Sequence, residues 1–140
     1  MKNLVILLLA LTVLSGCAAP VAANKTETAY RQVTAAEAAS LMDTEEDYIL
    51  LDVRTQAEYE EKHIPNAICI PNETIGSSEI PGLPDKDQLI LVYCRSGNRS
   101  KQAAAKLAAL GYTNVVEFGG ILDWSGETET GDNSPDSQEN

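Results

Sequence analysis

One stretch in the middle of the chain carries the residues best suited to nucleophilic chemistry. Cys94 is followed by Arg95, Ser96, Gly97, Asn98, Arg99 and Ser100. Apolar residues 89–93 predict a buried strand and the Ala-rich run 98–110 predicts a helix, so backbone N–H groups and a helix dipole should point at the cysteine. Such a cradle favours the thiolate of a group whose pKa is ordinarily about 8.5. We therefore expect Cys94 to be a nucleophile whose product is also an anion.

Other polar residues follow a second predicted strand. Apolar residues 48–51 predict this strand, and Asp52 and Arg54 stand at its carboxyl end. Ligand crevices form at such ends in open parallel sheets. The alternative, which we favour, is an ion-pair and hydrogen-bond network that fixes the loop.

His63 and Cys69 admit both a chemical and a structural interpretation. His63 is the only histidine and therefore the only obvious general base, but it precedes a proline turn and thiolate chemistry does not require a separate base. We expect it to be structural. Cys69 lies in the apolar run 67–70, which favours a small buried side chain; a disulfide with Cys94 is possible but would disable the nucleophile.

The remaining elements alternate between strands and short helices. Capping-box patterns at Thr34 and Thr55 predict helices over about 35–43 and from about 55 to 62. Strands are predicted at 67–70 and 115–118, with a long connection over 71–87 and a bend at Gly119-Gly120. Trp124 should lie in the core or at its rim, with substrate stacking as the alternative. This alternation predicts an α/β fold with a parallel sheet flanked by helices.

Length and charge limit the classes of function. The chain has 140 residues, and its first and last segments do not resemble a packed core. This leaves room for one domain of about a hundred residues. The 21 acidic and 10 basic residues give a net charge of −11, which opposes binding to nucleic acid or to an anionic lipid surface. We expect no nucleic-acid partner, and nothing suggests an obligate dimer, so we expect a monomer.

The amino terminus has the pattern of an export signal. Residues 1–16 comprise a charged start, the apolar run 4–14 and small residues, and the apolar run is too short to span a bilayer. The ending at Cys17 resembles the bacterial lipobox, which implies that Cys17 carries fatty acyl chains such as palmitate. Two chains, at ~0.8 kcal/mol per buried methylene, would hold the protein on the extracytoplasmic face of a cell membrane. The alternative is an ordinary secretory peptide, cut at a nearby Ala-x-Ala site.

Residues 17–29 lack apolar periodicity and predict a flexible tether, and residues 127–140 predict an acidic disordered tail.

Between these two segments, five ordered motifs together resemble a rhodanese domain over about 30–126. They are Leu51-Asp52-Val53-Arg54, Glu58-Tyr59, His63-Ile64-Pro65-x-Ala67, Tyr93 to Ser100, and Gly119-Gly120-Ile121-x-x-Trp124.

The resemblance implies a five-stranded, mostly parallel sheet and a sulfurtransferase reaction. Cys94 would take sulfur from a small donor such as thiosulfate, carry it as a persulfide and pass it to cyanide or a thiol, with no metal or organic cofactor. The residues from Arg95 to Ser100 would bind the substrate, with Arg95 and Arg99 attracting the anionic donor. The supporting residues would be Asp52, Arg54, Glu58 and His63. Lys62 and Asn66 depart from the family's frequent glycines, and we expect only small local changes there.

Two rival functions remain open. The related cysteine phosphatases and arsenate reductases use a Cys-x5-Arg loop, whereas four residues separate Cys94 from Arg99, and a shorter loop should suit a sulfur atom better than a tetrahedral oxyanion. The other rival is a non-catalytic rhodanese lipoprotein that binds sulfide or a partner. Inactive modules generally lack the cysteine, which is present here.

Overall fold

The computed structural model describes residues 29–76 and 78–132 of the chain. The predicted signal peptide, Cys17 and nearly all of the predicted tether lie outside the described residues, as do residues 133–140. No helix among the described residues is long and apolar enough to cross a membrane.

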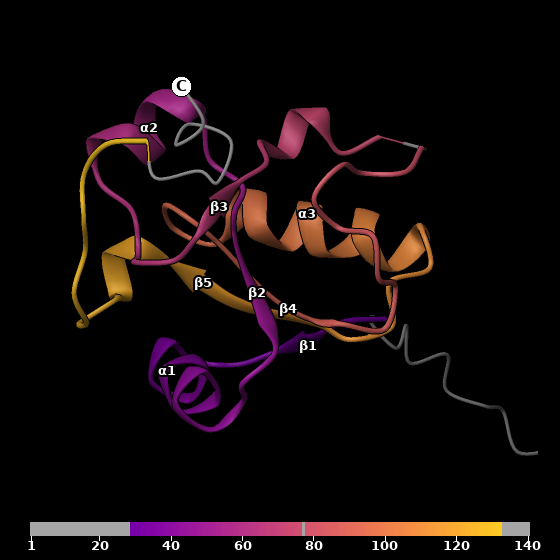
Figure 1. Ribbon diagram of the computed structural model, residues 1–140, viewed down its shortest axis with the longest axis horizontal. Coiled ribbons are helices and arrows are strands. Elements are labelled where there is room, and N and C mark those ends of the chain that lie inside the picture. Colours follow the sequence, from indigo (N-terminus) through magenta and orange to yellow (C-terminus); the bar gives the residue numbers. More distant parts are fainter. Residues whose placement is uncertain (1–28, 77, 133–140) are drawn as a thin grey trace, which may run out of the picture.

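A five-stranded parallel sheet forms the centre of the fold (Figure 1). Its strands, in spatial order, are β1 (Arg31–Gln32), β5 (Val115–Gly120), β4 (Leu89–Cys94), β2 (Tyr48–Asp52) and β3 (Ile68–Cys69), and every neighbouring pair is parallel. The predicted five-stranded α/β architecture is therefore confirmed. Parallel order places the carboxyl ends of β2 and β4 side by side, with Asp52 opposite Tyr93 in the register.

Helices cover both faces of this sheet. Helix α1 (Ala35–Thr44) lies on one face and α3 (Asn98–Ala109) on the other (Figure 1). The short helix α2 (Gln56–Glu61) follows β2 directly. Both predicted capping boxes form, at Thr34 and Thr55, and each satisfies N–H groups that a helix start leaves unpaired. In its described part, the long connection contains one 3₁₀ turn, Asn72–Thr74.

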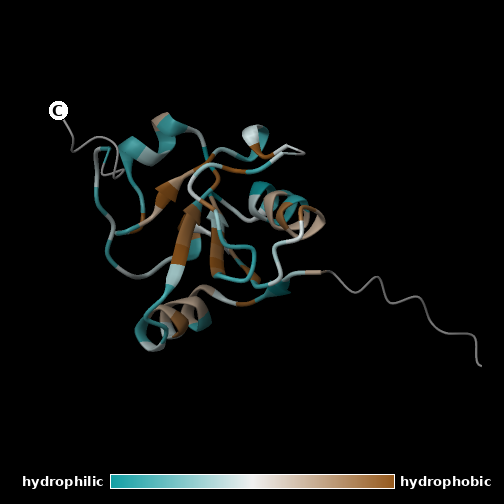
Figure 2. Cartoon of the chain, turned by 45° about the vertical axis from the view of Figure 1, so that its right-hand side comes forward, coloured by the Kyte–Doolittle hydropathy of each residue, from teal (hydrophilic) through white to brown (hydrophobic). Residues whose placement is uncertain are grey.

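The central strand β4 is buried on both sides, as a continuous apolar run in a parallel sheet requires. Figure 2 shows that the central strands are hydrophobic along most of their length. Alternate residues of β4 contribute to two core clusters: Ile90, Val92 and Cys94 belong to the cluster beneath α3, and Leu91 and Tyr93 to the one that faces α1. Alternation thus places Cys94 on the α3 side of the sheet.

The third and last strands differ from their predicted bounds. β3 contains only Ile68 and Cys69, while β5 continues through Gly119 and Gly120 instead of ending before them. The chain then enters a 3₁₀ turn, Ile121–Asp123. Trp124 is partly buried and lies against Phe118, with ring centroids 6.1 Å apart, as predicted for a residue at the rim of the core.

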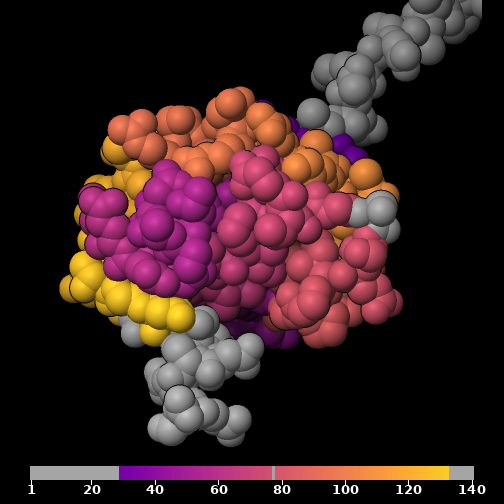
Figure 3. All heavy atoms as spheres, turned by 90° about the horizontal axis from the view of Figure 1, so that it is seen from above, coloured from indigo at the N-terminus to yellow at the C-terminus, as the bar shows by residue number. Residues whose placement is uncertain are grey.

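Residues 127–132, predicted to belong to a disordered tail, pair with the domain. The backbones of His63 and Glu129 exchange two hydrogen bonds of 2.9 and 2.8 Å, and Gly131 N–H donates to the Glu60 carbonyl over 2.8 Å. In Figure 3 this yellow segment lies beside α2. The prediction was wrong here because backbone pairing, rather than burial of apolar side chains, holds the segment. The predicted boundary at residue 126 is therefore too early.

Candidate active site

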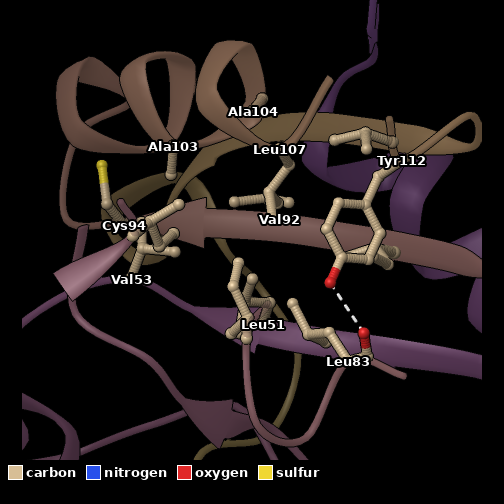
Figure 4. Close-up of a cluster of buried hydrophobic side chains, with 13 residues drawn as sticks. Leu51, Val53, Leu83, Val92, Cys94, Ala103, Ala104, Leu107 and Tyr112 are labelled. Carbon is tan, nitrogen blue, oxygen red and sulfur yellow. Dashed lines mark hydrogen bonds between the residues drawn. The ribbon is translucent and has the colours of Figure 1, made fainter. Parts of the chain in front are cut away.

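Cys94 is the last residue of β4 and lies beneath the first turn of α3 (Figure 4). Its side chain is almost wholly buried. The backbone N–H of Gly97 donates to Sγ over 3.1 Å, and the hydroxyl oxygen of Ser100 lies 3.5 Å from the same sulfur. Strand, loop and helix therefore meet at the sulfur as predicted.

The loop favours the thiolate form of Cys94. Burial is the largest single influence on the pKa of this thiol and raises it. Hydrogen bonds available from the Ser100 hydroxyl and from the backbone N–H groups of Ser100, Gly97 and Ser96 act against burial. Together they outweigh it, so the pKa of Cys94 lies below the ordinary value for a cysteine.

Glycines allow the loop to close around the sulfur. Gly97 has φ 104°, and a Cβ added there would lie 3.4 Å from the Cα of Gly119. A Cβ on Gly120 would collide with the carbonyl of Arg95. The double glycine in β5 therefore allows the Cys94 loop to pack directly on the neighbouring strand, in addition to the predicted bend.

The two arginines of the loop have different surroundings. Arg99 makes a two-pronged ion pair with Glu58, with Nη1–Oε2 and Nη2–Oε1 distances of 2.7 and 2.9 Å. The Arg99 hydrogen bond lowers the pKa of Glu58 to about 2. Arg95 is exposed and has no side-chain hydrogen bond or ion pair within the described part of the chain. Glu58 therefore neutralises Arg99, whereas Arg95 is an exposed cation without a side-chain partner among the described residues.

The predicted network of Asp52 and Arg54 is present. Both residues are buried, and Arg54 Nη2 lies 2.6 Å from Asp52 Oδ2. The same guanidinium donates to the Lys62 carbonyl over 2.6 Å, and the Arg54 backbone N–H donates to Asp52 Oδ1. This pair joins the end of β2 to the end of α2 and leaves no charged group free for a ligand, so its role is structural.

His63 is fully buried and both of its ring nitrogens have partners. Nδ1 donates to the Tyr59 carbonyl over 2.8 Å, Nε2 lies 3.1 Å from Glu129 Oε1, and the ring stacks on Tyr59 with centroids 3.8 Å apart. The histidine thus ties α2 to the C-terminal segment, which agrees with the structural interpretation.

The remaining loop residues differ in burial, and the two departures from the family pattern have the backbone conformations that we expected. Ser96 and Asn98 are exposed at the mouth of the loop, and Ser100 is buried within it. Asn66 has φ 67°, the left-handed conformation that asparagine tolerates, whereas Lys62 has the extended φ of −169°.

Cys69 remains a free thiol, as does Cys94. It is only partly buried, and its sulfur lies 3.6 Å from the Arg54 carbonyl. Across residues 29–76 and 78–132, no group of three or more His, Cys, Asp or Glu side chains is placed to hold a metal ion.

One residue of the site, Glu117 in β5, was missed by the sequence analysis. It is 2% exposed, and its Oε1 lies 2.6 Å from the hydroxyl oxygen of Ser100, which in turn lies 3.5 Å from the sulfur of Cys94. The available signal was a single acidic residue within an otherwise apolar strand.

The Rhodanese-like domain family matches residues 34–127. With this match, and with the sheet and cysteine loop described above, the chain belongs to the rhodanese-like domain family. A "Sulfurtransferase" of Allochromatium vinosum is 46% identical over 88 residues, which cover 61% of this chain and 78% of the relative. The thiosulfate sulfurtransferase GlpE of Coxiella burnetii is 34% identical over 104 residues, which cover 74% and 94%.

Solved structures agree with the family. The BH2092 protein of Bacillus halodurans superimposes with a TM-score of 0.63 and 33% identity over 71% of this chain and 77% of that one. A rhodanese with anions from E. coli gives a TM-score of 0.56 and 33% identity over 60% and 99%. The relatives support sulfur transfer as the general activity.

Proposed function

We propose that this protein is a sulfurtransferase that takes sulfur from an anionic donor such as thiosulfate, carries it on Cys94 and delivers it to a thiol or to cyanide. The observation that carries the proposal is the sulfur of Cys94 at the focus of the loop, with the Gly97 N–H 3.1 Å away and a lowered pKa. A cradle of N–H groups stabilises an anion on the sulfur before and after it is loaded.

The reaction needs two displacements. The Cys94 thiolate attacks the outer sulfur of thiosulfate, a new S–S bond forms, the S–S bond of the donor breaks, and sulfite leaves with its electron pair. An acceptor thiolate or cyanide then attacks the outer sulfur of the persulfide, so that the acceptor gains the sulfur and the Cys94 thiolate is restored. The exposed Arg95 beside the loop favours approach of the dianionic donor.

Mass spectrometry of Cys94 tests the proposal. Incubation with thiosulfate should add the mass of one sulfur atom to the peptide that contains Cys94, and addition of cyanide should remove it. A Cys94→Ser variant is the control and should show no adduct. If several sulfane donors leave Cys94 unmodified, the protein is a non-catalytic member of the family, which is the main rival.

The phosphatase alternative is weakened by the pairing of Arg99. A phosphatase loop uses its arginine to bind two oxygens of the oxyanion, whereas both terminal nitrogens of Arg99 are bonded to Glu58. Assay of the same sample with an aryl phosphate should therefore show no turnover that depends on Cys94.

We also propose that the protein is exported and anchored to a membrane by lipid on Cys17. The lipobox-like residues before Cys17 support this proposal. Growth of the expressing bacterium with radiolabelled palmitate should label the protein, and Cys17→Ser should abolish the label and release the protein from the membrane fraction. Unlabelled protein in the soluble fraction would instead indicate an ordinary secretory signal.

A further inference from the structure

Glu117 is a buried carboxylate beside the proposed nucleophile. Its Oε1 accepts hydrogen bonds from the Ser100 hydroxyl over 2.6 Å and from the Gly119 N–H over 2.8 Å, and its Oε2 accepts from Gln32 Nε2 over 3.3 Å. A carboxylate that is 2% exposed costs free energy unless such donors satisfy it. The donors come from β1, β5 and α3, so three elements of the fold supply the hydrogen bonds of this carboxylate.

Ser100 connects this carboxylate to Cys94. Ser100 is fully buried, and its single hydroxyl hydrogen has three oxygen acceptors in reach: Glu117 Oε1 at 2.6 Å, the Gly97 carbonyl at 3.0 Å and the Gly119 carbonyl at 3.1 Å. The carboxylate is the shortest of these contacts and the only charged one, so it is the strongest competitor. The sulfur of Cys94, at 3.5 Å, competes for the same hydrogen.

We propose that Glu117 is a positioning residue that acts on Cys94 through Ser100, by withholding the Ser100 hydroxyl hydrogen from the sulfur. While the hydroxyl donates to Glu117, its oxygen presents lone pairs to Cys94, which suits a protonated thiol and disfavours a thiolate. The thiol proton is exchanged with solvent, and none is transferred to Glu117. The carboxylate therefore limits the fraction of Cys94 that is present as thiolate when no sulfur donor is bound. A lower thiolate fraction would slow sulfur transfer, and only this effect on turnover rests on the proposed function.

The other titratable or charged groups near Glu117 and Ser100 are more exposed or already paired. They are Tyr30 and Arg31 beside Gln32, Lys101 on α3, Asp123 after β5, and the Arg99–Glu58 pair. Lys101 and Asp123 line the pocket next to Glu117 but are exposed, so water and salt screen them. The pKa of Tyr30 is raised, first by burial and then by the charge of Glu117.

The pH dependence of Cys94 alkylation tests this proposal in the full chain. Iodoacetamide reacts with the thiolate, and peptide mass mapping separates Cys94 from the other cysteines. Glu117→Gln should lower the midpoint of the rate profile and raise the rate at neutral pH by about tenfold, which corresponds to one pH unit. In a Ser100→Ala background, the shift of the midpoint caused by Glu117→Gln should be less than half as large.

Ser100→Ala alone gives a second test that keeps Glu117 intact. Because the hydroxyl donates to Glu117 and presents its oxygen to Cys94, removing it should lower the alkylation midpoint or leave it unchanged. A rise of a full unit would show that the hydroxyl already donates to sulfur and would overturn the proposal. An unchanged or higher midpoint in Glu117→Gln, or an equal shift in both backgrounds, would also overturn it. Alkylation does not require sulfur transfer, so this result stands apart from the persulfide test.

Discussion

The two described cysteines end parallel strands on either side of β2, yet their thiols have opposite properties. The pKa of Cys94, at the end of β4, is lowered, whereas that of Cys69, at the end of β3, is raised to about 12. Burial raises both, and at Cys69 the carboxylate of Asp52 raises the pKa further. Position at the carboxyl end of a parallel strand is therefore insufficient to make a reactive cysteine.

The backbone that follows each strand accounts for the difference. After Cys69 the chain remains extended, and the N–H groups of Ile70 and Asn72 donate to the carbonyls of Asp52 and Val53 over 3.0 Å. After Cys94 the chain turns into α3, and the Gly97 N–H points at sulfur. N–H groups bonded to the neighbouring strand cannot stabilise a thiolate, whereas those of a loop before a helix can.

Removal of each sulfur tests this comparison most directly. Cys94→Ser should reduce thiosulfate:cyanide sulfurtransfer by at least about 10³-fold, because a serine hydroxyl cannot carry the sulfur at neutral pH. Cys69→Ser should retain nearly all activity. The measurement is thiocyanate formation, and a large loss in Cys69→Ser would show that both sulfurs take part.

Displacement of the loop N–H should have the next largest effect. Gly97→Ala adds a Cβ at φ 104° against Gly119 and should lower kcat by about tenfold to a hundredfold, at a strain of ~1–2 kcal/mol. Gly111→Ala is the matched control, since Gly111 has φ 93° at the end of α3 with nothing within 4 Å of the added Cβ.

Gly111→Ala should lose comparable stability in urea unfolding and retain kcat. If the two variants lose activity equally, the loss reflects strain in general rather than the position of the Gly97 N–H.

Removal of the exposed cation next to Cys94, Arg95, should have a smaller effect on activity. Arg95→Ala should raise the KM for thiosulfate by about tenfold, because a charge-assisted contact of ~1.5 kcal/mol is lost, and should weaken the dependence of kcat/KM on salt. Arg31→Ala, which removes another exposed cation on β1, is the control and should change KM little. Equal effects would indicate that net charge alone attracts the donor.

Loss of the Glu58–Arg99 ion pair should have the smallest effect. It should change the stability of the fold, by an amount that depends on pH. The pKa of Glu58 is about 2 in the folded protein against an ordinary 4.5, so the pair stabilises the fold fully above about pH 4.5 and ceases to do so as the pH falls toward 2. Its partial exposure limits the contribution to ~1 kcal/mol or less.

Glu58→Gln preserves the capping-box pattern. It should be less stable than the native protein in urea at pH 7, and the difference should narrow at pH 3. A difference of constant size would contradict the assignment of this pKa to the ion pair.

Much of the architecture follows from local sequence. Capping boxes at Thr34 and Thr55, the apolar run of β4 and the Ala-rich α3 predicted their elements because each pattern depends on residues within a few positions of one another. The bounds of β3 and β5 were less accurate, since the ends of a strand depend on which neighbour it meets.

The sequence by itself determined the loop around Cys94, because a strand, a short loop and a helix are adjacent in the chain and their N–H groups converge without distant help. Only the tertiary structure decided which charges remain free. Glu58 neutralises Arg99 across 41 residues, Glu117 bonds to Ser100 across 17, and Glu129 binds His63 across 66. Spacing along the chain does not encode such pairs, because they form only when parallel strands and their helices bring distant segments together.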